Sequence, residues 1–152
     1  PSPNQTSLFV DDYDGSIEYA LTKADFNNCI FYGSTNYSIV FEKEGSDSNF
    51  NYQFNNCLIK FNDFNNQFSN NPLYQFSTDT VHYVNCIIAT NNTVANPQFL
   101  NVIKNKLIIG EDSAAKGQAN PLFAQGTFDI SGNQRLNPYD IGAYNYTIFE
   151  ED

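Results

Sequence analysis

The fold is decided by a stretch that occurs three times, first as Ala24-Asp25-Phe26-Asn27-Asn28-Cys29-Ile30-Phe31. It returns as Tyr52-Gln53-Phe54-Asn55-Asn56-Cys57-Leu58-Ile59 and again as Val81-His82-Tyr83-Val84-Asn85-Cys86-Ile87-Ile88, with the cysteines 28 and 29 residues apart. In every copy the residue before the cysteine is Asn, the third residue before it is aromatic, and the two after it are apolar. Agreement in these four columns indicates an internal repeat of stacked structural units.

Each copy has the pattern of two short strands joined by a bend. Apolar residues alternate before the Asn, as Ala24 and Phe26 do in the first copy, and alternation is strand periodicity. Asn also tolerates the left-handed backbone that a bend requires. We therefore expect parallel strands about 4.8 Å apart, with Asn28, Asn56 and Asn85 as neighbouring rungs of an asparagine ladder bonded amide to amide.

A third apolar strand should follow each copy. The candidates are Ile39-Val40-Phe41, Leu73-Tyr74-Gln75-Phe76 and Gln98-Phe99-Leu100, with variable polar loops at Glu42 to Ser48, Asn62 to Asn71 and Asn91 to Ala95. A period near 28 residues predicts an all-β solenoid of about four to five coils. We expect one domain over residues 1–152, with coils over 16–101 and an irregular C-terminal coil and cap over 102–152, because a last coil without a cap exposes strand edges.

Composition restricts the classes of function. The chain has 14 Phe, 10 Tyr, 23 Asn and a net charge of −10, and that charge disfavours nucleic acid and anionic lipid as partners. No apolar run approaches the roughly 20 residues that span a bilayer, so we expect no membrane insertion.

The three cysteines lack the spacing of a zinc site, and we expect them to pack in the core. Because the chain has no Met, we also expect that upstream residues were removed and that the N-terminal face continues into further coils.

With these residues in view, the chain resembles the right-handed parallel β-helix surface proteins of Bacteroidetes, which share the pectate-lyase-like superfamily fold. The repeated Asn-Cys-Ile unit is similar to the family's repeat, and the C-terminal end is similar to its closing signature. That signature comprises Asn96-Pro97-Gln98-Phe99, Leu107-Ile108-Ile109, Asp112-Ser113-Ala114-Ala115-Lys116-Gly117, Asp129-Ile130-Ser131-Gly132-Asn133-Gln134-Arg135 and Tyr139-Asp140-Ile141-Gly142-Ala143-Tyr144. Ala114, Lys116 and Ser131 depart from the family's pattern.

The resemblance implies a secreted or surface-anchored extracellular protein whose fold is a single-stranded, right-handed parallel β-helix. Members of the superfamily include polysaccharide lyases, hydrolases and adhesins, and a fold by itself does not choose among such functions. Our first hypothesis is a non-catalytic C-terminal β-helix portion of a longer protein of this kind, which contacts polysaccharide or cell-envelope glycan through its loops. The alternatives are the C-terminal part of a polysaccharide lyase or other carbohydrate-active enzyme, and a purely structural spacer. The oligomeric state is left open.

Aromatic residues beside the variable loops are the candidate glycan contacts, because sugar rings stack on aromatic faces. They are Tyr32, Tyr37, Phe61 and Phe64, with Phe68 nearby. The alternative is that these rings close over the core as loop anchors. Lys60, which lies near Asp63 in the sequence, is the weak candidate for a catalytic residue.

Asp129, Ser131 and Asn133 place oxygen atoms at alternate positions around Gly132, as a calcium loop begins. Because no bidentate Glu follows, we favour a structural turn with no cofactor, and calcium is the alternative.

Arg135, the only Arg, is expected to bind Asp140 or backbone carbonyls. His82, the only His, has no partners for a catalytic triad. Alternation predicts that His82 faces solvent while Val81 and Tyr83 face the core.

Overall fold

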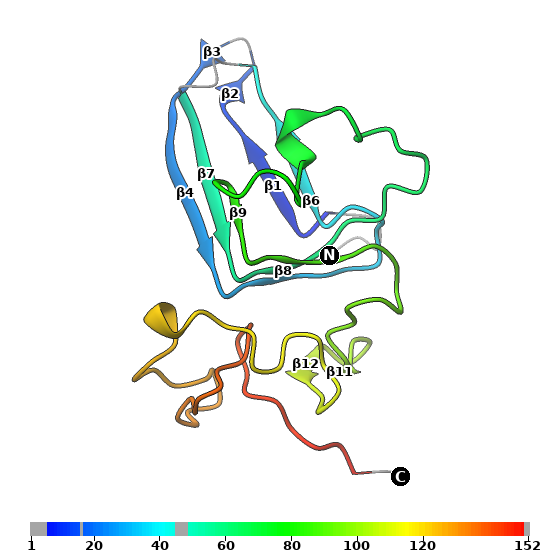
Figure 1. Cartoon of the computed structure of the whole chain (residues 1–152), viewed down its shortest axis with the longest axis vertical. Helices are drawn as coiled ribbons and strands as arrows, with labels where there is room; N and C mark the ends of the chain where they lie inside the picture. The colour runs from blue at the N-terminus through cyan, green and yellow to red at the C-terminus, as the bar shows by residue number, and fades with distance from the viewer. Residues whose placement is uncertain (1–5, 16, 45–48, 151–152) are drawn as a thin grey trace.

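A computed structural model describes residues 6–15, 17–44 and 49–150 (Figure 1). Its strands are β1 (Leu8–Asp11), β2 (Tyr13–Asp14), β3 (Ile17–Glu18), β4 (Leu21–Asn27), β5 (Ile30–Phe31), β6 (Ile39–Glu42), β7 (Phe50–Asn55), β8 (Leu58–Lys60), β9 (Tyr83–Val84), β10 (Ile87–Ala89), β11 (Phe99–Asn101) and β12 (Lys106–Ile109). Two short 3-10 helices are η2 (Pro72–Tyr74) and η3 (Pro121–Phe123). The expected all-β class is confirmed.

The three sequence copies form three stacked rungs. Rung 1 is β4 and β5, rung 2 is β7 and β8, and rung 3 is β9 and β10; the strands pair in parallel in the orders β4-β7-β9 and β5-β8-β10. Phe54 pairs with Phe26 on one side and with Tyr83 on the other. The register predicted from the cysteine alignment is therefore confirmed, and the rungs nearly superpose as an L in Figure 1.

A left-handed Asn turns each rung through its corner. Asn28, Asn56 and Asn85 have φ of 54°, 49° and 50°, which confirms the predicted bend. The expected amide-to-amide ladder is wrong for the first two of these residues. Nδ2 of Asn28 donates to the carbonyl of Asn120, and Nδ2 of Asn56 donates to the carbonyl of Gln118. The corner amides turn outward because the C-terminal segment supplies acceptors there.

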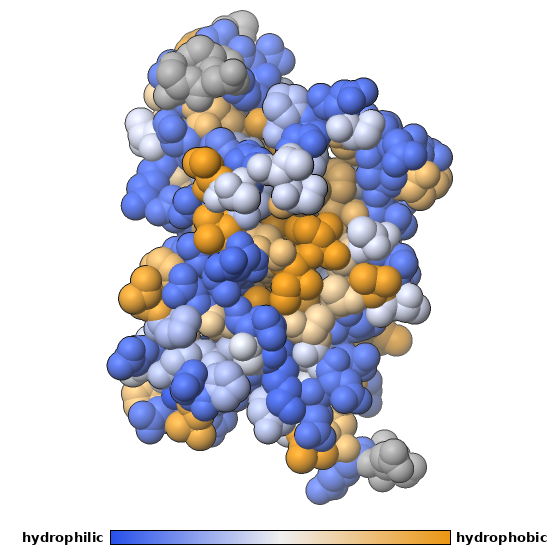
Figure 2. All heavy atoms as spheres, in the orientation of Figure 1, coloured by the Kyte–Doolittle hydropathy of each residue, from blue (hydrophilic) through white to orange (hydrophobic). Residues whose placement is uncertain are grey.

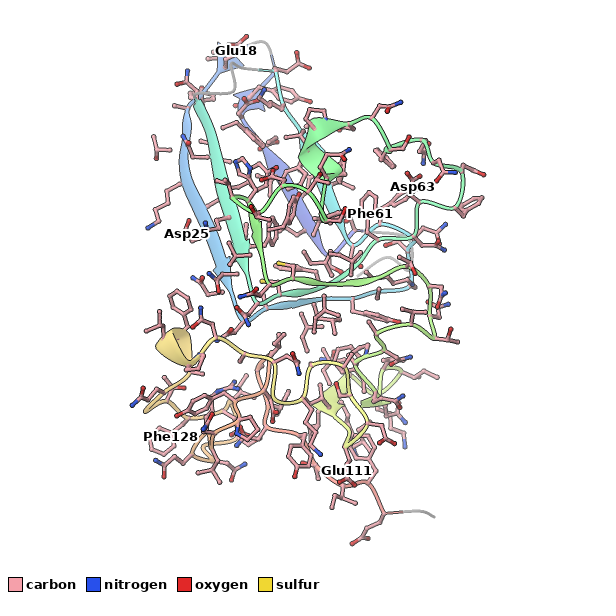
Figure 3. All side chains as sticks on the ribbon, in the orientation of Figure 1. Glu18, Asp25, Phe61, Asp63, Glu111 and Phe128 are labelled. Carbon is pink, nitrogen blue, oxygen red and sulfur yellow. The ribbon has the colours of Figure 1, made fainter. Side chains whose placement is uncertain are left out.

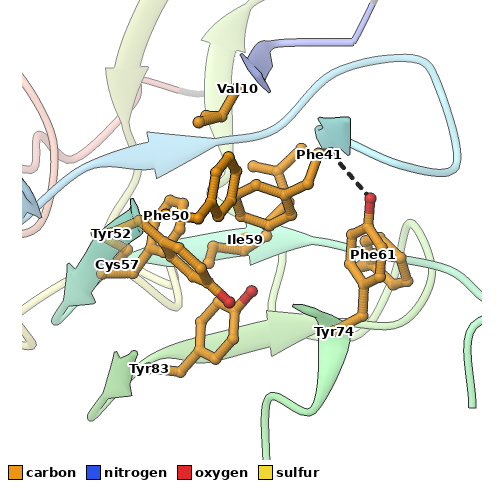
Figure 4. Packing of buried hydrophobic residues seen from close by; sticks show 11 residues of the cluster. Val10, Phe41, Phe50, Tyr52, Cys57, Ile59, Phe61, Tyr74 and Tyr83 are labelled. Atoms are coloured by element: carbon orange, nitrogen blue, oxygen red, sulfur yellow. Dashed lines mark hydrogen bonds between the residues drawn. The ribbon is translucent and has the colours of Figure 1, made fainter. Parts of the chain in front are cut away.

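Aromatic rings stack inside the angle of the L and form the main core (Figure 4). Phe54 lies between Phe26, at 4.8 Å between ring centroids and 18° between planes, and Tyr83, at 5.5 Å and 12°. Phe31 and Phe41 meet the Phe54 ring edge-on. The equal spacing of parallel strands places identical columns of side chains in contact, and the Phe54 side chain is fully buried.

The third side of the stack is interrupted. The strand expected at Ile39 to Phe41 is confirmed as β6, which pairs in parallel with β1, a partner that the sequence did not reveal. The strand expected at Leu73 to Phe76 is wrong, because Asn71 accepts a hydrogen bond from the Leu73 N–H and starts η2. The Tyr74 hydroxyl instead accepts from the Phe41 N–H.

Residues 102–150 pack sideways against the outer face of the β5-β8-β10 sheet, below the rungs in Figure 1. Together with Leu58 of β8, this segment forms a second core. Its members from the segment are Ile109, Ala115, Ala119, Ala124 and Ile141, and Ile30, Ile87 and Phe99 pack beside them. The segment thus contacts all three rungs rather than covering rung 3 alone. β11, near the last expected third strand, pairs antiparallel with β12 and not with a rung.

Gly142 permits the closest approach of this segment to the rungs. Its φ is +104°, and a Cβ there would lie 2.7 Å from Cδ1 of Ile30. The Gly142 N–H donates to the Asn28 carbonyl, so the left-handed backbone of glycine and its missing side chain are both used.

Core and loop aromatics should respond differently to truncation. Phe54→Ala removes the fully buried ring at the centre of the stack, and we expect a loss of about 3 to 5 kcal/mol in the free energy of unfolding. Phe64→Ala, at a side chain that is 65% exposed, should change it by about 0.5 kcal/mol or less. Urea denaturation measures both, and equal losses would contradict the assigned core.

Candidate functional site

A cleft of about 530 Å³ lies beside the corner that follows β5. We call it the Tyr32 cleft. Residues 32–34 form one wall and residues 92–107 contribute the other; the lining residues are Tyr32, Gly33, Ser34, Asn92, Asn96, Pro97, Gln98, Phe99, Val102 and Leu107. The rings of Tyr32 and Phe99 meet edge to face, with centroids 6.4 Å apart and planes at 87°.

The polar groups of the Tyr32 cleft are amides and hydroxyls. Oδ1 of Asn96 accepts from the Gln98 N–H and its Nδ2 donates to the Asn92 carbonyl, so Asn96 fixes the loop that carries the other two amides. No carboxylate and no amine stands among the described residues of the lining, although the chain has 17 acidic residues. The cleft therefore offers hydrogen bonds and aromatic faces without a formal charge.

Lys60 holds the wall of the Tyr32 cleft that residues 32–34 form. It is only 3% exposed, its Nζ donates to the Gly33 carbonyl at 2.8 Å, and Nζ lies 5.4 Å from the centroid of the Tyr32 ring. Burial lowers the pKa of Lys60 and raises that of Tyr32. Asp63 does not serve as its partner, because both Asp63 oxygens accept backbone N–H groups, those of Gln67 and Phe68. Lys60 is therefore a structural anchor of the cleft wall.

The four predicted glycan contacts do not form one surface. Only Tyr32 lines the Tyr32 cleft. Phe61 is buried and packs with Tyr37 and Phe68, as the loop-anchor alternative supposed. Phe64 is exposed on the loop after β8, where Figure 3 labels its neighbour Asp63. The amides of the cleft were missed because they lie in the loop between β10 and β11, and only the tertiary structure places that loop of rung 3 beside Tyr32 of rung 1.

A second hollow, of about 510 Å³, opens at rung 3. We call it the end hollow, and its lining is Phe61, Asn62, Asp63, Phe68, Ser69, Tyr74, Gln75, Phe76, Ser77, Cys86, Ile88 and Thr90. Figure 2 shows hydrophobic residues gathered near the centre of the molecule, around the place that Figure 1 labels β8. The end hollow occupies the position where a third strand of rung 3 would lie.

Asp129 organises the turn that was a calcium candidate. Its Oδ1 accepts from the N–H groups of Ser131 and Asn133, and its Oδ2 accepts from the Asn145 N–H and from the Asn133 side chain. Burial opposes ionisation, but these donors outweigh it and lower the pKa of Asp129. The protein's own N–H groups thus occupy both oxygens. Among the residues that the structure describes, no three His, Cys, Asp or Glu side chains are grouped to hold a metal ion.

Arg135 binds backbone carbonyls, as predicted, through the oxygens of Asp140 and Gly142. The prediction that Val81 faces the core is wrong, and His82, expected to face solvent, is half-buried. Residues 81 and 82 lie in a turn before β9, so strand alternation does not apply to them; Val81 is 69% exposed. The His82 ring stacks on Tyr52 at 4.4 Å, and its Nδ1 lies 2.6 Å from Oδ2 of Asp79.

The three thiols form a column through the rungs. Cys57 is fully buried, and Cys29 and Cys86 on either side are half-buried. Hydrogen bonding to Cys29 and Cys86, together with burial, raises the pKa of Cys57.

Among the described residues, no helix is long and apolar enough to cross a membrane.

Thiol chemistry should separate the centre of this column from its ends. At low protein concentration, Cys29 and Cys86 should react with a disulfide reagent within minutes, whereas Cys57 should wait for unfolding because its thiolate is disfavoured and enclosed. Peptide mapping of the labelled protein measures this order. Rapid labelling of Cys57 in the folded protein would contradict it.

The Asp129 turn should make stability depend on pH. A depressed pKa contributes stability above about pH 4, and this is lost as pH falls through the folded-state pKa. Asp129→Asn should therefore cost about 1 to 3 kcal/mol at pH 7, and its difference from the unmutated protein should shrink toward pH 3. Urea denaturation at each pH measures the difference, and a constant value would contradict this role. Millimolar calcium should leave Tm unchanged; a rise would restore the metal interpretation.

Comparison of the chain with protein-family models, with curated proteins and with solved structures finds no match in any of the three.

Proposed function

We propose that the three rungs are coils of a right-handed parallel β-helix, as the sequence resemblance implies. Parallel pairing at offsets near 28 residues supports this, because each rung begins again directly beside the previous one. A left-handed Asn at the same corner of every rung supports it as well. On this proposal β6 and the segment around η2 are third sides of the first two coils.

On this scaffold we propose a non-catalytic module that binds glycan, as part of an extracellular or surface-displayed protein. The observation that carries the proposal is the uncharged aromatic and amide lining of the Tyr32 cleft. A sugar presents C–H faces that pack on aromatic rings, and hydroxyls that exchange hydrogen bonds with amides. Because the lining has no formal charge, a neutral sugar is the ligand class that fits best.

The first alternative is the C-terminal part of a carbohydrate-active enzyme. Glycoside hydrolysis commonly uses two carboxyl groups that flank the scissile bond, and the described lining of the Tyr32 cleft provides none. The Lys60 amine is enclosed behind Tyr32 and bound to Gly33, which disfavours it as a base. On this alternative the catalytic groups would come from elsewhere in a longer protein. A structural spacer without a ligand is the second alternative.

A glycan array with the purified chain tests the proposal. Neutral oligosaccharides should bind, and Phe99→Ala should weaken the affinity about tenfold or more by removing one of the two rings, since about 1.4 kcal/mol is tenfold. Asn92→Ala, on the rim, tests the cleft by a change that leaves the core intact. Titration calorimetry measures the affinities, and thermal melting checks the fold of each variant.

Phe128→Ala is the matched control. This ring is exposed and lies in the C-terminal segment, outside the Tyr32 cleft (Figure 3), so its loss should leave binding unchanged. An array without binding favours the spacer. Release of reducing or unsaturated ends from a bound glycan favours the enzyme. Binding that survives the Phe99 and Asn92 changes contradicts the assignment to this cleft.

A further inference from the structure

A second cleft, of about 520 Å³, adjoins the Tyr32 cleft. We call it the Cys29 cleft. Residues 28–31 of rung 1 contribute one wall, and the other lining residues used below are Phe99, Asn105, Leu107 and Tyr144. Phe99 lies in β11 and Leu107 in β12, so the second wall comes from the same pair of strands that borders the Tyr32 cleft.

The two clefts continue each other along both walls. Residues 28–31 line the Cys29 cleft, and residues 32–34, which follow directly, line the Tyr32 cleft. On the other wall, Phe99 and Leu107 line both clefts. At about 3.3 Å per extended residue, the wall of residues 28–34 spans up to roughly 20 Å. We call the combined hollow the rung 1 groove, and it is longer than a single sugar ring.

The Cys29 cleft has the same kind of lining as the Tyr32 cleft. Its described lining residues include aromatic rings and polar groups but no carboxylate, amine or guanidinium. Within the described part of the chain, the side-chain amide of Asn105 and the hydroxyl of Tyr144 bond no other protein group, so both are available to a ligand. The amide of Asn28, in contrast, bonds the backbone of Asn120 through both its oxygen and its nitrogen.

We propose that the rung 1 groove binds an extended neutral oligosaccharide, with one part of the sugar chain in the Tyr32 cleft and the next part in the Cys29 cleft. This inference rests on the proposed glycan function and assigns it a ligand longer than one sugar. A linear oligosaccharide fits because its successive units present C–H faces to rings and hydroxyls to amides along the whole groove. Phe99 stands at the junction and contacts sugar units on both sides.

The charges around the groove favour a neutral chain. Lys104 and Lys106 lie in the turn and strand that follow β11, but their side chains are exposed and line neither cleft. The net charge of −10 repels a polyuronate. A neutral oligosaccharide avoids that repulsion and needs no charged partner in the groove.

A length series tests the inference. Titration calorimetry uses the neutral sugar that the array selects, from the monosaccharide to the hexasaccharide. The affinity should rise about tenfold or more between the disaccharide and the hexasaccharide, since about 1.4 kcal/mol of added contact is tenfold. An affinity that stops rising at the disaccharide overturns the inference and leaves the proposed function standing. If no neutral sugar binds, both are overturned, and tighter binding of uronate chains overturns the neutral class.

Labelling of Cys29 reports whether the second cleft is filled. Hydrogen bonding to Cys57 lowers the pKa of Cys29 to about 7, although burial opposes this, so iodoacetamide reacts with its thiolate at neutral pH. Cys86 is the internal control, because it is also half-buried but lines the end hollow. With the hexasaccharide at about ten times its Kd, labelling of Cys29 should slow about tenfold and that of Cys86 should not change.

Peptide mapping measures both labelling rates. The monosaccharide should protect neither thiol. Full labelling of Cys29 under saturating hexasaccharide, or equal protection of Cys86, contradicts the placement of the sugar chain in the Cys29 cleft.

Two variants remove the free polar groups of the second cleft. They are Tyr144→Phe and Asn105→Gly, and glycine keeps the left-handed backbone that Asn105 adopts at φ of 54°. Each should weaken hexasaccharide binding about three- to tenfold and leave disaccharide binding unchanged. Tyr146→Phe is the matched control, because Tyr146 lines neither cleft. Unchanged hexasaccharide binding in both variants, or an equal loss for the disaccharide, overturns the second subsite, and thermal melting checks each fold.

Discussion

The left-handed asparagine at the corner of each rung is the constraint on which the rest of the structure depends. Asn28, Asn56 and Asn85 each hold φ near +50°, a conformation that Asn tolerates better than most residues. Because the corner recurs at one place in the repeat, the strands before and after it stack as two separate sheets. The same corners dock the C-terminal segment: Asn120 bonds Asn28 through its backbone and the Asn55 side chain through its own amide.

Two cores result from this arrangement, one on each face of the β5-β8-β10 sheet. Alternation along β8 sends Ile59 into the aromatic stack and Leu58 into the contact with residues 102–150. A strand buried on both faces reads as continuously apolar, which is why the residues after each cysteine carry no polar alternation. Removing the C-terminal segment would therefore expose Leu58 and its neighbours along the whole stack.

The two hollows lie where the regular stacking of strands ends. The Tyr32 cleft forms where the chain leaves the rungs, passes through β11 and β12, and returns beneath them. The end hollow forms where the third side is missing. Their linings also differ. Uncharged amides and two rings suit a sugar, whereas the lining of the end hollow includes the Asp63 carboxylate beside its aromatic rings.

The sequence by itself determined the rungs, their register, the left-handed corners and the backbone role of Arg135, because all of these follow from local periodicity or from neighbours close along the chain. Tertiary structure decided the rest. The corner amides of Asn28 and Asn56 found acceptors more than 60 residues away in place of each other. A short helix replaced the strand at residues 73–76. Because β9 begins only at Tyr83, Val81 lies in solvent and His82 stacks on Tyr52. A repeat in the sequence predicts the contacts that every unit makes with the next one. A partner outside the repeat produces no periodic pattern, so the sequence alone does not predict contacts with it.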